Sequence, residues 1–317
     1  MLKPGASVTI SDYIHGVIKT YVKSLLLQYI RVDLLVDVYI PKSLKAPLRL
    51  TRGQGERKRV KLTTKVPKNF QSFLRVDEHK TELNGLIAEE LIEMDCPDGT
   101  SLIITKGNKV LSNQVMPSLD MISPSDHEEA DTKGLLHARH MKIHGINSIM
   151  MRTCDTDQLV LAIAAQSFLQ FDEFWLSFGV GRSHKYIPVH DLVHQLGHSV
   201  AKALPGFHAF TGCDTVSSFH GKGKKTCWDI FQLYPEFIPA FRVLSEISPT
   251  KEDIDAIFPL LNKFTARIYQ NNDEFQDVDS LRLHLLIHKG KSFDSMPPGS
   301  DSLKLKSCRA GYQGGHI

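Results

Sequence analysis

The sequence lacks the features that mark several large classes of protein. No apolar run approaches the roughly 20 residues of a membrane-spanning helix, and residues 1–30 lack the pattern of a signal peptide, so no membrane partner is expected. The five cysteines are scattered and no two have CxxC spacing, which argues against a zinc ribbon or a disulfide framework. This cysteine usage indicates a reducing, intracellular compartment.

Positive charge is concentrated in one segment of the chain. Residues 42–68 contain ten Lys or Arg residues and one acid, although the net charge of the whole chain is only +3. Such a cluster attracts phosphate groups, so DNA or RNA is the expected partner. The side chains of this segment expected to contact nucleic acid are Arg52, Arg57, Lys58 and Arg59. A solvated loop or a nuclear-import signal is the alternative interpretation.

Hydrophobic patterns predict strands that alternate with helices. Strands are predicted at residues 31–39, 101–111 (a hairpin), 149–154, 173–180 and 186–188. Helices are predicted at residues 11–27 (capped by Ser11 or Asp12), 70–74, 80–92, 126–144, 158–168, 189–204, 226–233, 236–244, 251–268 and 278–288. This alternation implies an α/β fold with a mainly parallel central sheet and helices on both faces.

Carboxylates occur where predicted strands end, in four separate segments. The acids are Asp37, Glu129, Asp131, Asp155, Asp157 and Asp214. The carboxyl ends of parallel strands meet at one edge of a sheet, where functional sites form. Converging carboxylates repel one another, and two divalent cations roughly 3.5–4 Å apart are a known device for phosphoryl displacement at such a site. Because all the ligands are oxygens, Mg²⁺ or Mn²⁺ is expected rather than zinc.

The same acids also have structural interpretations. A single acid before a helix often caps it, which is the alternative role for Asp155 or Asp157. Ser125 followed by Glu128 is the pattern of a capping box at the start of the helix that runs to His144. The remaining acids can be helix-dipole, strand-end or turn charges.

A glycine- and lysine-rich turn follows Asp214. Its sequence is Gly221-Lys222-Gly223-Lys224-Lys225, and a helix is predicted directly after it. Glycines allow the backbone to approach a phosphate, and lysines neutralise the charge. The GxxxxGK[ST] pattern of a nucleotide-binding loop is absent, so the turn better fits a helix–hairpin–helix that holds a nucleic-acid backbone.

Two sets of histidines have helical spacing. His137, His140 and His144 form one set, and His190, His194 and His198 form the other. Neither set has partner cysteines, so both are predicted to be polar helix faces rather than metal ligands.

Five motifs in order resemble the flap-endonuclease/XPG-type 5′ nucleases of the PIN-like superfamily, and the resemblance covers residues 28–235. The matches are Val36-Asp37 with the basic run behind it (V-F-D-G and the basic arch), Glu129-Ala130-Asp131 (E-A-E), residues 154–159 (D-x-D-x-L), residues 211–214 (L-G-x-D) and residues 221–225 (G-I-G-x-K). The pattern HEEAD…DTD…FTGCD…GKGKK also resembles a group of uncharacterised invertebrate PIN-like proteins.

The resemblance implies a nuclease that hydrolyses DNA or RNA phosphodiesters, with the six carboxylates as catalytic ligands of two Mg²⁺ or Mn²⁺ ions. It also implies K⁺ at the Gly221–Lys225 turn. No acid in residues 1–10 matches the metal ligand of the family's first strand, so that strand is expected to be missing, and Val38 replaces a family glycine. The alternatives are a pseudo-nuclease that binds nucleic acid without cutting it, and a phosphatase with an aspartyl intermediate at Asp155-Thr156-Asp157.

The predicted organisation follows from these motifs. Residues 1–215 form the PIN-like core, with the basic segment 42–68 inside it, and residues 216–235 form the helix–hairpin–helix. Residues 236–293 form a helical C-terminal region. Residues 294–317, which include Pro297 and Pro298, are expected to be a linker and tail.

Overall fold

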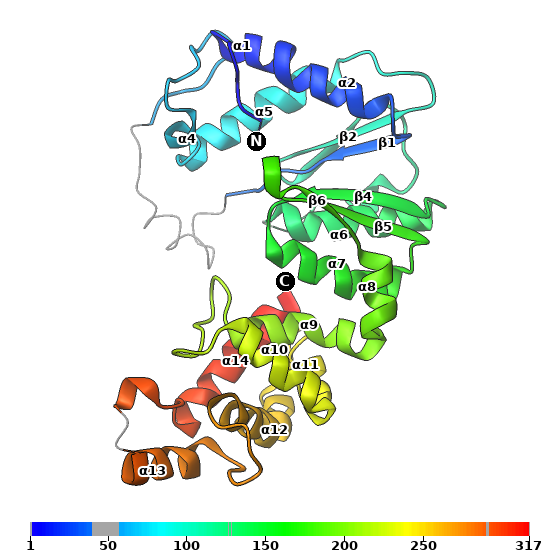
Figure 1. The fold of residues 1–317 in the computed structure, drawn as a ribbon. Helices are drawn as coiled ribbons and strands as arrows, with labels where there is room; N and C mark the ends of the chain where they lie inside the picture. Colours follow the sequence, from blue (N-terminus) through cyan, green and yellow to red (C-terminus); the bar gives the residue numbers. More distant parts are fainter. Residues whose placement is uncertain (1, 40–56, 126, 128, 290–291, 317) are drawn as a thin grey trace. The chain divides into compact units, whose positions relative to one another are not determined.

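The α/β class predicted from the sequence is confirmed. A computed structural model describes every residue except 1, 40–56, 126, 128, 290–291 and 317 (Figure 1). The chain divides into two compact units, Met1–His144 and Gly145–Ile317. The boundary between them therefore falls inside the predicted core of residues 1–215, next to Gly145, whose φ of +81° ends a helix.

The first unit contains one small sheet and the helices around it. Its elements are α1 (Ile10–Tyr13), the π-helical η1 (Ile14–Lys19), α2 (Thr20–Leu26), β1 (Arg31–Leu34), α4 (Phe70–Phe73), α5 (Asp77–Ile92), β2 (Ser101–Lys106), β3 (Lys109–Ser112), the 3₁₀ turn η2 (Leu119–Met121) and α6 (Ala130–Ile143). The first helix is capped by Thr9, whose hydroxyl accepts from the Asp12 amide while Asp12 accepts from the Thr9 amide. Ser11 and Asp12 are therefore not the cap that the sequence predicted.

The sheet of the first unit has the order β1-β2-β3. Strands β1 and β2 are parallel, with Arg31 opposite Ser101, and β3 is antiparallel to β2. The central strand is buried on both faces. Leu102 and Ile104 pack in the core that α1, α2 and α5 supply, while Ile103 packs in a separate cluster with Val110 and with Leu136 of α6.

The second unit begins with a similar sheet and continues as a helical assembly. Its elements are β4 (Ser148–Thr153), α7 (Thr156–Leu169), β5 (Glu173–Phe178), η3 (Gly181–Ser183), β6 (Lys185–Pro188), α8 (Val189–Leu196), α9 (His198–Thr211), α10 (Lys224–Leu233), η4 (Pro235–Phe237), α11 (Ile238–Val243), α12 (Lys251–Tyr269), α13 (Val278–Lys289), η5 (Phe293–Ser295) and α14 (Ser300–His316). Strand β5 pairs in parallel with β4 and antiparallel with β6. Each described sheet is therefore small and mixed.

The helix predicted over residues 189–204 is two helices. Gly197 separates α8 from α9 with a φ of +78°. Helix α9 then continues through Pro205 to Thr211. The Gly206 amide, next to the proline, donates to Ser245 Oγ at 2.8 Å, so a neighbouring segment satisfies it. Asp214 consequently follows a helix and not a strand end.

The core of the second unit is rich in aromatic rings. Phe207 and Phe210 of α9 contact Phe241 of α11 and Phe264 of α12, and the Phe241 and Phe264 ring centroids are 4.9 Å apart. Edge-on ring pairs of this kind stabilise a core beyond their burial alone. They fix α9, which carries residues of the candidate site described below.

The prediction that residues 294–317 form a linker and tail is wrong over α14. This helix packs against α9 and buries Leu303 and Ala310. Its glycines permit very close approach, because a Cβ at Gly314 would lie 2.3 Å from the Leu244 carbonyl oxygen. The linker prediction rested on Pro297 and Pro298, which lie just before the helix begins at Ser300.

Candidate functional site

The six predicted carboxylates are divided equally between the two units. Asp37, Glu129 and Asp131 lie in the first unit, and Asp155, Asp157 and Asp214 lie in the second. Among the residues that the structure describes, no group of three or more His, Cys, Asp or Glu side chains is close enough together to hold a metal ion. The geometry is therefore described one unit at a time.

In the first unit, Asp37 meets the start of α6. Its Oδ1 accepts a hydrogen bond of 2.9 Å from the Ala130 amide, the first residue of the helix. The N-cap residue Glu129 makes no side-chain cap, so Asp37 satisfies an amide that the helix itself leaves open. Asp37, Glu129 and Asp131 are thus brought to the same helix terminus, as their motifs predicted.

The capping box predicted for Ser125 and Glu128 is wrong for this helix, which begins at Ala130. Ser125 Oγ instead accepts from the His127 amide at 3.3 Å. Glu128 lies outside the described residues. A carboxylate from a distant segment, Asp37, provides the cap that local pattern assigned to a serine.

Lys133 is a buried cation beside this helix terminus. It is 1% exposed, and its ammonium group donates to the Val36 carbonyl oxygen at 2.9 Å and to the Gly107 oxygen at 3.4 Å. Burial lowers the pKa of Lys133, and the Asp37 carboxylate opposes that shift. Lys133 therefore positions the segment that ends at Asp37. The sequence analysis did not identify it.

In the second unit, Asp155 caps α7. Its Oδ1 accepts a hydrogen bond of 2.9 Å from the Asp157 amide, which confirms the capping interpretation for this acid. The Asp155 amide donates to Thr153 Oγ1 at 3.0 Å. These two bonds fix the backbone of the DTD corner, so the direction of the Asp157 side chain is set by a rigid turn.

Asp157 lies beside His208 of α9. The distance from Asp157 Oδ1 to His208 Nε2 is 3.0 Å, but the angle does not satisfy a hydrogen bond. His208 is 6% exposed, and its Nε2 has no hydrogen-bond partner in the described part of the chain. His208 lies beyond the predicted end of its helix at residue 204, and it has no spacing relationship to the acids, so local pattern does not indicate it.

The glycine–lysine turn reaches the same helix. Gly223 is the N-cap of α10, and Lys224 is its first residue. Much of the Lys224 side chain is exposed, but its ammonium group points inward and donates to the His208 carbonyl oxygen at 2.8 Å and to Thr211 Oγ1 at 3.2 Å. Burial lowers the pKa of Lys224, and the charges of Cys213 and Asp157 oppose that shift.

The other lysines of the turn face outward to different degrees. Lys222 places its ammonium group 5.3 Å from the centroid of the Tyr269 ring. Lys225 is exposed and pairs with Asp229 at 2.9 Å, one helical turn away. Gly221 has a φ of +66°, which favours glycine. Lys222 and Lys225 are therefore the lysines of this turn that present charge to solvent.

The loop that carries Asp214 is held by α14. The backbone at Gly212 has a φ of +116°, and a Cβ there would lie 2.7 Å from Ser218 Cα. The ammonium group of Lys306 donates to the Ser217 carbonyl oxygen and lies 4.5 Å from the Phe219 ring centroid. Lys306 is 6% exposed, and burial lowers its pKa to about 8. A buried ammonium group thus ties the Asp214 loop to the C-terminal helix.

In the described part of the basic segment, residues 57–60 contact α5, whereas residues 62–66 are hydrogen-bonded to residues 8–11. Arg57 Nη2 is 4.0 Å from Glu82 Oε1, and the Lys58 amide donates to His79 Nε2 at 2.7 Å. Arg57, Lys58 and Arg59 are all exposed. Arg52 lies outside the described residues. Residues 57–59 therefore place positive charge at the surface of the first unit.

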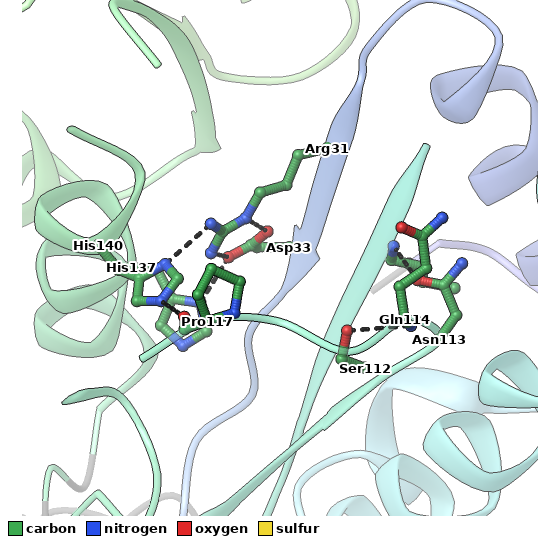
Figure 2. A network of polar contacts seen from close by, with 9 residues as sticks. Arg31, Asp33, Ser112, Asn113, Gln114, Pro117, His137 and His140 are labelled. Atoms are coloured by element: carbon green, nitrogen blue, oxygen red, sulfur yellow. Dashed lines mark hydrogen bonds and ion pairs between the residues drawn. The ribbon is translucent and has the colours of Figure 1, made fainter. Parts of the chain in front are cut away.

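The sequence predicts that His137, His140 and His144 form a polar helix face. This prediction is wrong for His137 and His140. Figure 2 shows His137 and His140 directed toward Arg31 and Asp33. Asp33 Oδ2 is 2.6 Å from His137 Nδ1, and Arg31 makes two bonds of 2.8 Å to the Asp33 carboxylate and one of 2.9 Å to His140 Nδ1. The set is a closed, buried polar network and not a solvated helix face.

The surroundings of this network lower the pKa values of both Asp33 and His140. Burial raises the pKa of Asp33, but the hydrogen bonds from His137 and Arg31 outweigh burial, and the net shift is downward. Burial lowers the pKa of His140, whose Nε2 is 3.1 Å from the Pro117 carbonyl oxygen. In the second histidine set, His194 and His198 are exposed as predicted, while His190 Nδ1 is 3.2 Å from backbone atoms of Phe174.

Comparisons with known proteins assign no family. No family model, no curated protein and no solved structure matches the chain. No helix in the described residues is long and apolar enough to cross a membrane. The function is therefore argued from the side chains themselves.

Proposed function

We propose that the chain is a metal-dependent nuclease-type domain that hydrolyses phosphodiester bonds of DNA or RNA. One observation carries the proposal. The DTD corner and the glycine–lysine turn, predicted from unconnected motifs, both contact His208: Asp157 Oδ1 lies 3.0 Å from its Nε2, and Lys224 donates to its carbonyl oxygen at 2.8 Å. Carboxylates beside a phosphate-binding turn are the combination that phosphodiester hydrolysis requires.

The proposal includes the finer features expected from the sequence. These are a PIN-like core with a mainly parallel central sheet and helices on both faces, a helix–hairpin–helix over residues 216–235, and a helical C-terminal part. The turn at Gly221–Lys225 would bind K⁺ and the nucleic-acid backbone. A nuclear location would agree with the basic run but is not required by the chemistry.

The donor set fits hard divalent cations. Carboxylate oxygens suit Mg²⁺ or Mn²⁺, and each unit offers three such side chains: Asp37, Glu129 and Asp131 in the first, and Asp155, Asp157 and Asp214 in the second. When bound, two such ions would activate water and stabilise the charge on the attacking and leaving oxygens. The protein's own contribution is orientation. Backbone amides fix one oxygen each of Asp37 and Asp155, and the half-buried Lys222 and the exposed Lys225 would attract phosphate.

The double variant Asp155→Asn, Asp157→Asn tests the proposal. Cleavage of single-stranded and duplex DNA and of RNA in Mg²⁺ or Mn²⁺ should fall by at least roughly 100-fold, because both positions lose charge. The matched control is Asp95→Asn, Asp98→Asn, a pair of exposed acids in the first unit. Circular dichroism establishes folding of each variant. Equal cleavage by the wild type and the first variant would disprove the assignment.

A second candidate function is a pseudo-nuclease that binds nucleic acid without cutting it. Two observations favour it: the exposed basic side chains at residues 57–59, and the absence of a three-ligand group among the described residues. Filter binding at several salt concentrations, together with cleavage assays, distinguishes the two. Binding that weakens steeply with salt in the absence of cleavage would select the second candidate.

A further inference from the structure

His208 is a buried imidazole whose Nε2 has no hydrogen-bond partner among the described residues. It is 6% exposed, and Asp157 Oδ1 is only 3.0 Å from this nitrogen. A buried polar atom without a partner destabilises a fold, and native proteins retain few of them. The pair is close, yet it does not have the angle of a hydrogen bond. A carboxylate oxygen and an imidazole nitrogen placed in this way can both bind the same metal ion.

The separation of the two atoms matches the spacing of adjacent ligands on a metal ion. Ligand atoms about 2.0–2.1 Å from one octahedral cation and at right angles to each other are about 3.0 Å apart. The observed distance from Asp157 Oδ1 to His208 Nε2 is 3.0 Å. The angle that rules out a hydrogen bond does not rule out this arrangement, because both atoms then direct lone pairs to the ion.

Both ligand positions are fixed by the fold. The Asp157 amide is bonded to Asp155 Oδ1, which holds the first turn of α7. Helix α7 packs against α9, as Figure 1 shows. On α9, Lys224 Nζ donates to the His208 carbonyl oxygen, and Thr211 Oγ1 donates to the Phe207 carbonyl oxygen at 2.8 Å. The backbone positions of the two residues are therefore fixed by contacts within the second unit.

We propose that Asp157 Oδ1 and His208 Nε2 bind one divalent cation, and that the imidazole makes the site prefer a first-row transition metal such as Mn²⁺ over Mg²⁺. Imidazole nitrogen suits transition metals, whereas Mg²⁺ favours oxygen ligands. Water and, in a complex, phosphate oxygens fill the remaining positions. The inference deepens the proposed function, since the cation is one of the ions the nuclease would use, but metal binding is measurable without substrate.

Electron paramagnetic resonance on the full chain tests the site. Mn²⁺ bound to the wild type should show pulsed-resonance coupling to a histidine ¹⁴N nucleus, and His208→Gln should abolish it. The same variant should weaken Mn²⁺ binding by at least about 10-fold, with a change in Mg²⁺ binding below about threefold. Asp157→Asn should also weaken Mn²⁺ binding. His190→Gln, which alters a half-buried histidine of the same unit, is the matched control and should change neither.

The outcomes separate this inference from the nuclease proposal. Bound Mn²⁺ without nitrogen coupling would overturn the His208 site and leave a nuclease possible. Nitrogen-coupled Mn²⁺ in a protein that cleaves no nucleic acid would support the site and overturn the nuclease. Failure to bind Mn²⁺ at millimolar concentration would overturn the site. If His208→Gln does not fold, wild-type protein labelled with ¹⁵N-histidine serves instead, and a spectrum that the label leaves unchanged would contradict the proposal.

Discussion

Two contacts between an aspartate and a histidine, one in each unit, differ in how completely their polar atoms are satisfied. Asp33 receives hydrogen bonds from His137 and from two nitrogens of Arg31, and its side chain is 5% exposed. Asp157 lies 3.0 Å from His208 but leaves Nε2 unbonded, and its side chain is 27% exposed. The first pair is closed and stabilises the fold. In the second pair, His208 Nε2 has no hydrogen-bond partner among the described residues, and this is where we propose that a cation binds.

The Asp33–His137 pair has a third member, Arg31. Arg31 supplies a positive charge that compensates Asp33 inside the first unit, so burial of the carboxylate is tolerated. Near Asp157 the ammonium group of Lys224 is committed to backbone and hydroxyl oxygens of α9. The sequence pattern of an acid and a distant histidine is the same in both cases. The two pairs differ in that Arg31 completes the hydrogen bonding of the first, whereas His208 Nε2 of the second has no hydrogen-bond partner among the described residues.

The largest expected effect comes from breaking the closed pair. Asp33→Ala leaves Arg31 and His137 buried without their counter-ion, so the free energy of unfolding should fall by about 3–5 kcal/mol. Urea denaturation measures it, with the exposed Asp98→Ala as control. A loss below about 1 kcal/mol would contradict a structural role for the network.

The pH dependence of the closed pair has a definite sign. The pKa of Asp33 is lowered in the folded protein from its ordinary value of 3.8. Its stabilising contribution is therefore fully present above pH 3.8 and is lost as the pH falls through the lower folded pKa. The stability difference between the wild type and Asp33→Ala should narrow only in that acidic window.

A smaller effect is expected from the helix contact that supports the second unit. Gly314→Ala places a Cβ 2.3 Å from the Leu244 oxygen, and such overpacking costs about 1–3 kcal/mol of stability. The matched control is Gly16→Ala in the first unit, where an added Cβ meets nothing within 4 Å. Thermal unfolding should separate the two variants. Equal melting temperatures would show that α14 does not pack closely in solution.

Lys306 should give a weaker, pH-dependent effect. Its folded pKa of about 8 is below the ordinary 10.5, so the folded state binds its proton less readily than the unfolded state. The energetic penalty is full below about pH 8 and is relieved as the pH rises toward 10.5. Relative to Lys306→Met, the wild type should therefore gain roughly 1 kcal/mol per pH unit over that window. A difference that stays constant with pH would contradict burial of the charge.

The smallest effect concerns the exposed lysines. Lys225→Gln should reduce the slope of log affinity against log salt for DNA by about one, without changing stability by more than about 0.5 kcal/mol. Lys251→Gln, a lysine exposed at the start of α12, is the control. An unchanged slope would remove Lys225 from the nucleic-acid surface. That result would not bear on the proposed metal site at Asp157 and His208.

The elements set by local pattern could be predicted from the sequence. Helix α7 with its Asp155 cap and the hairpin of β2 and β3 depend on neighbouring residues, and both were located. Features that depend on contacts between residues far apart in the sequence were not predicted. His137 was predicted to be solvated because its partner Asp33 is 104 residues away. Helix α14 was predicted to be a tail because of Pro297 and Pro298, and its packing depends on the distant residues Leu244 and Glu246. His208 was not predicted either, because its neighbour Asp157 is far from it in the sequence.

The most direct test compares Asp157→Asn with Asp33→Asn in two assays, the free energy of unfolding and the affinity for Mn²⁺. The second pair, with its proposed cation site, predicts that Asp157→Asn stays within about 0.5 kcal/mol of the wild type and loses Mn²⁺ binding. The closed pair predicts that Asp33→Asn loses several kcal/mol, with Mn²⁺ affinity unchanged wherever the protein remains folded. An Asp157→Asn protein that unfolds, or one that binds Mn²⁺ as the wild type does, would contradict the account.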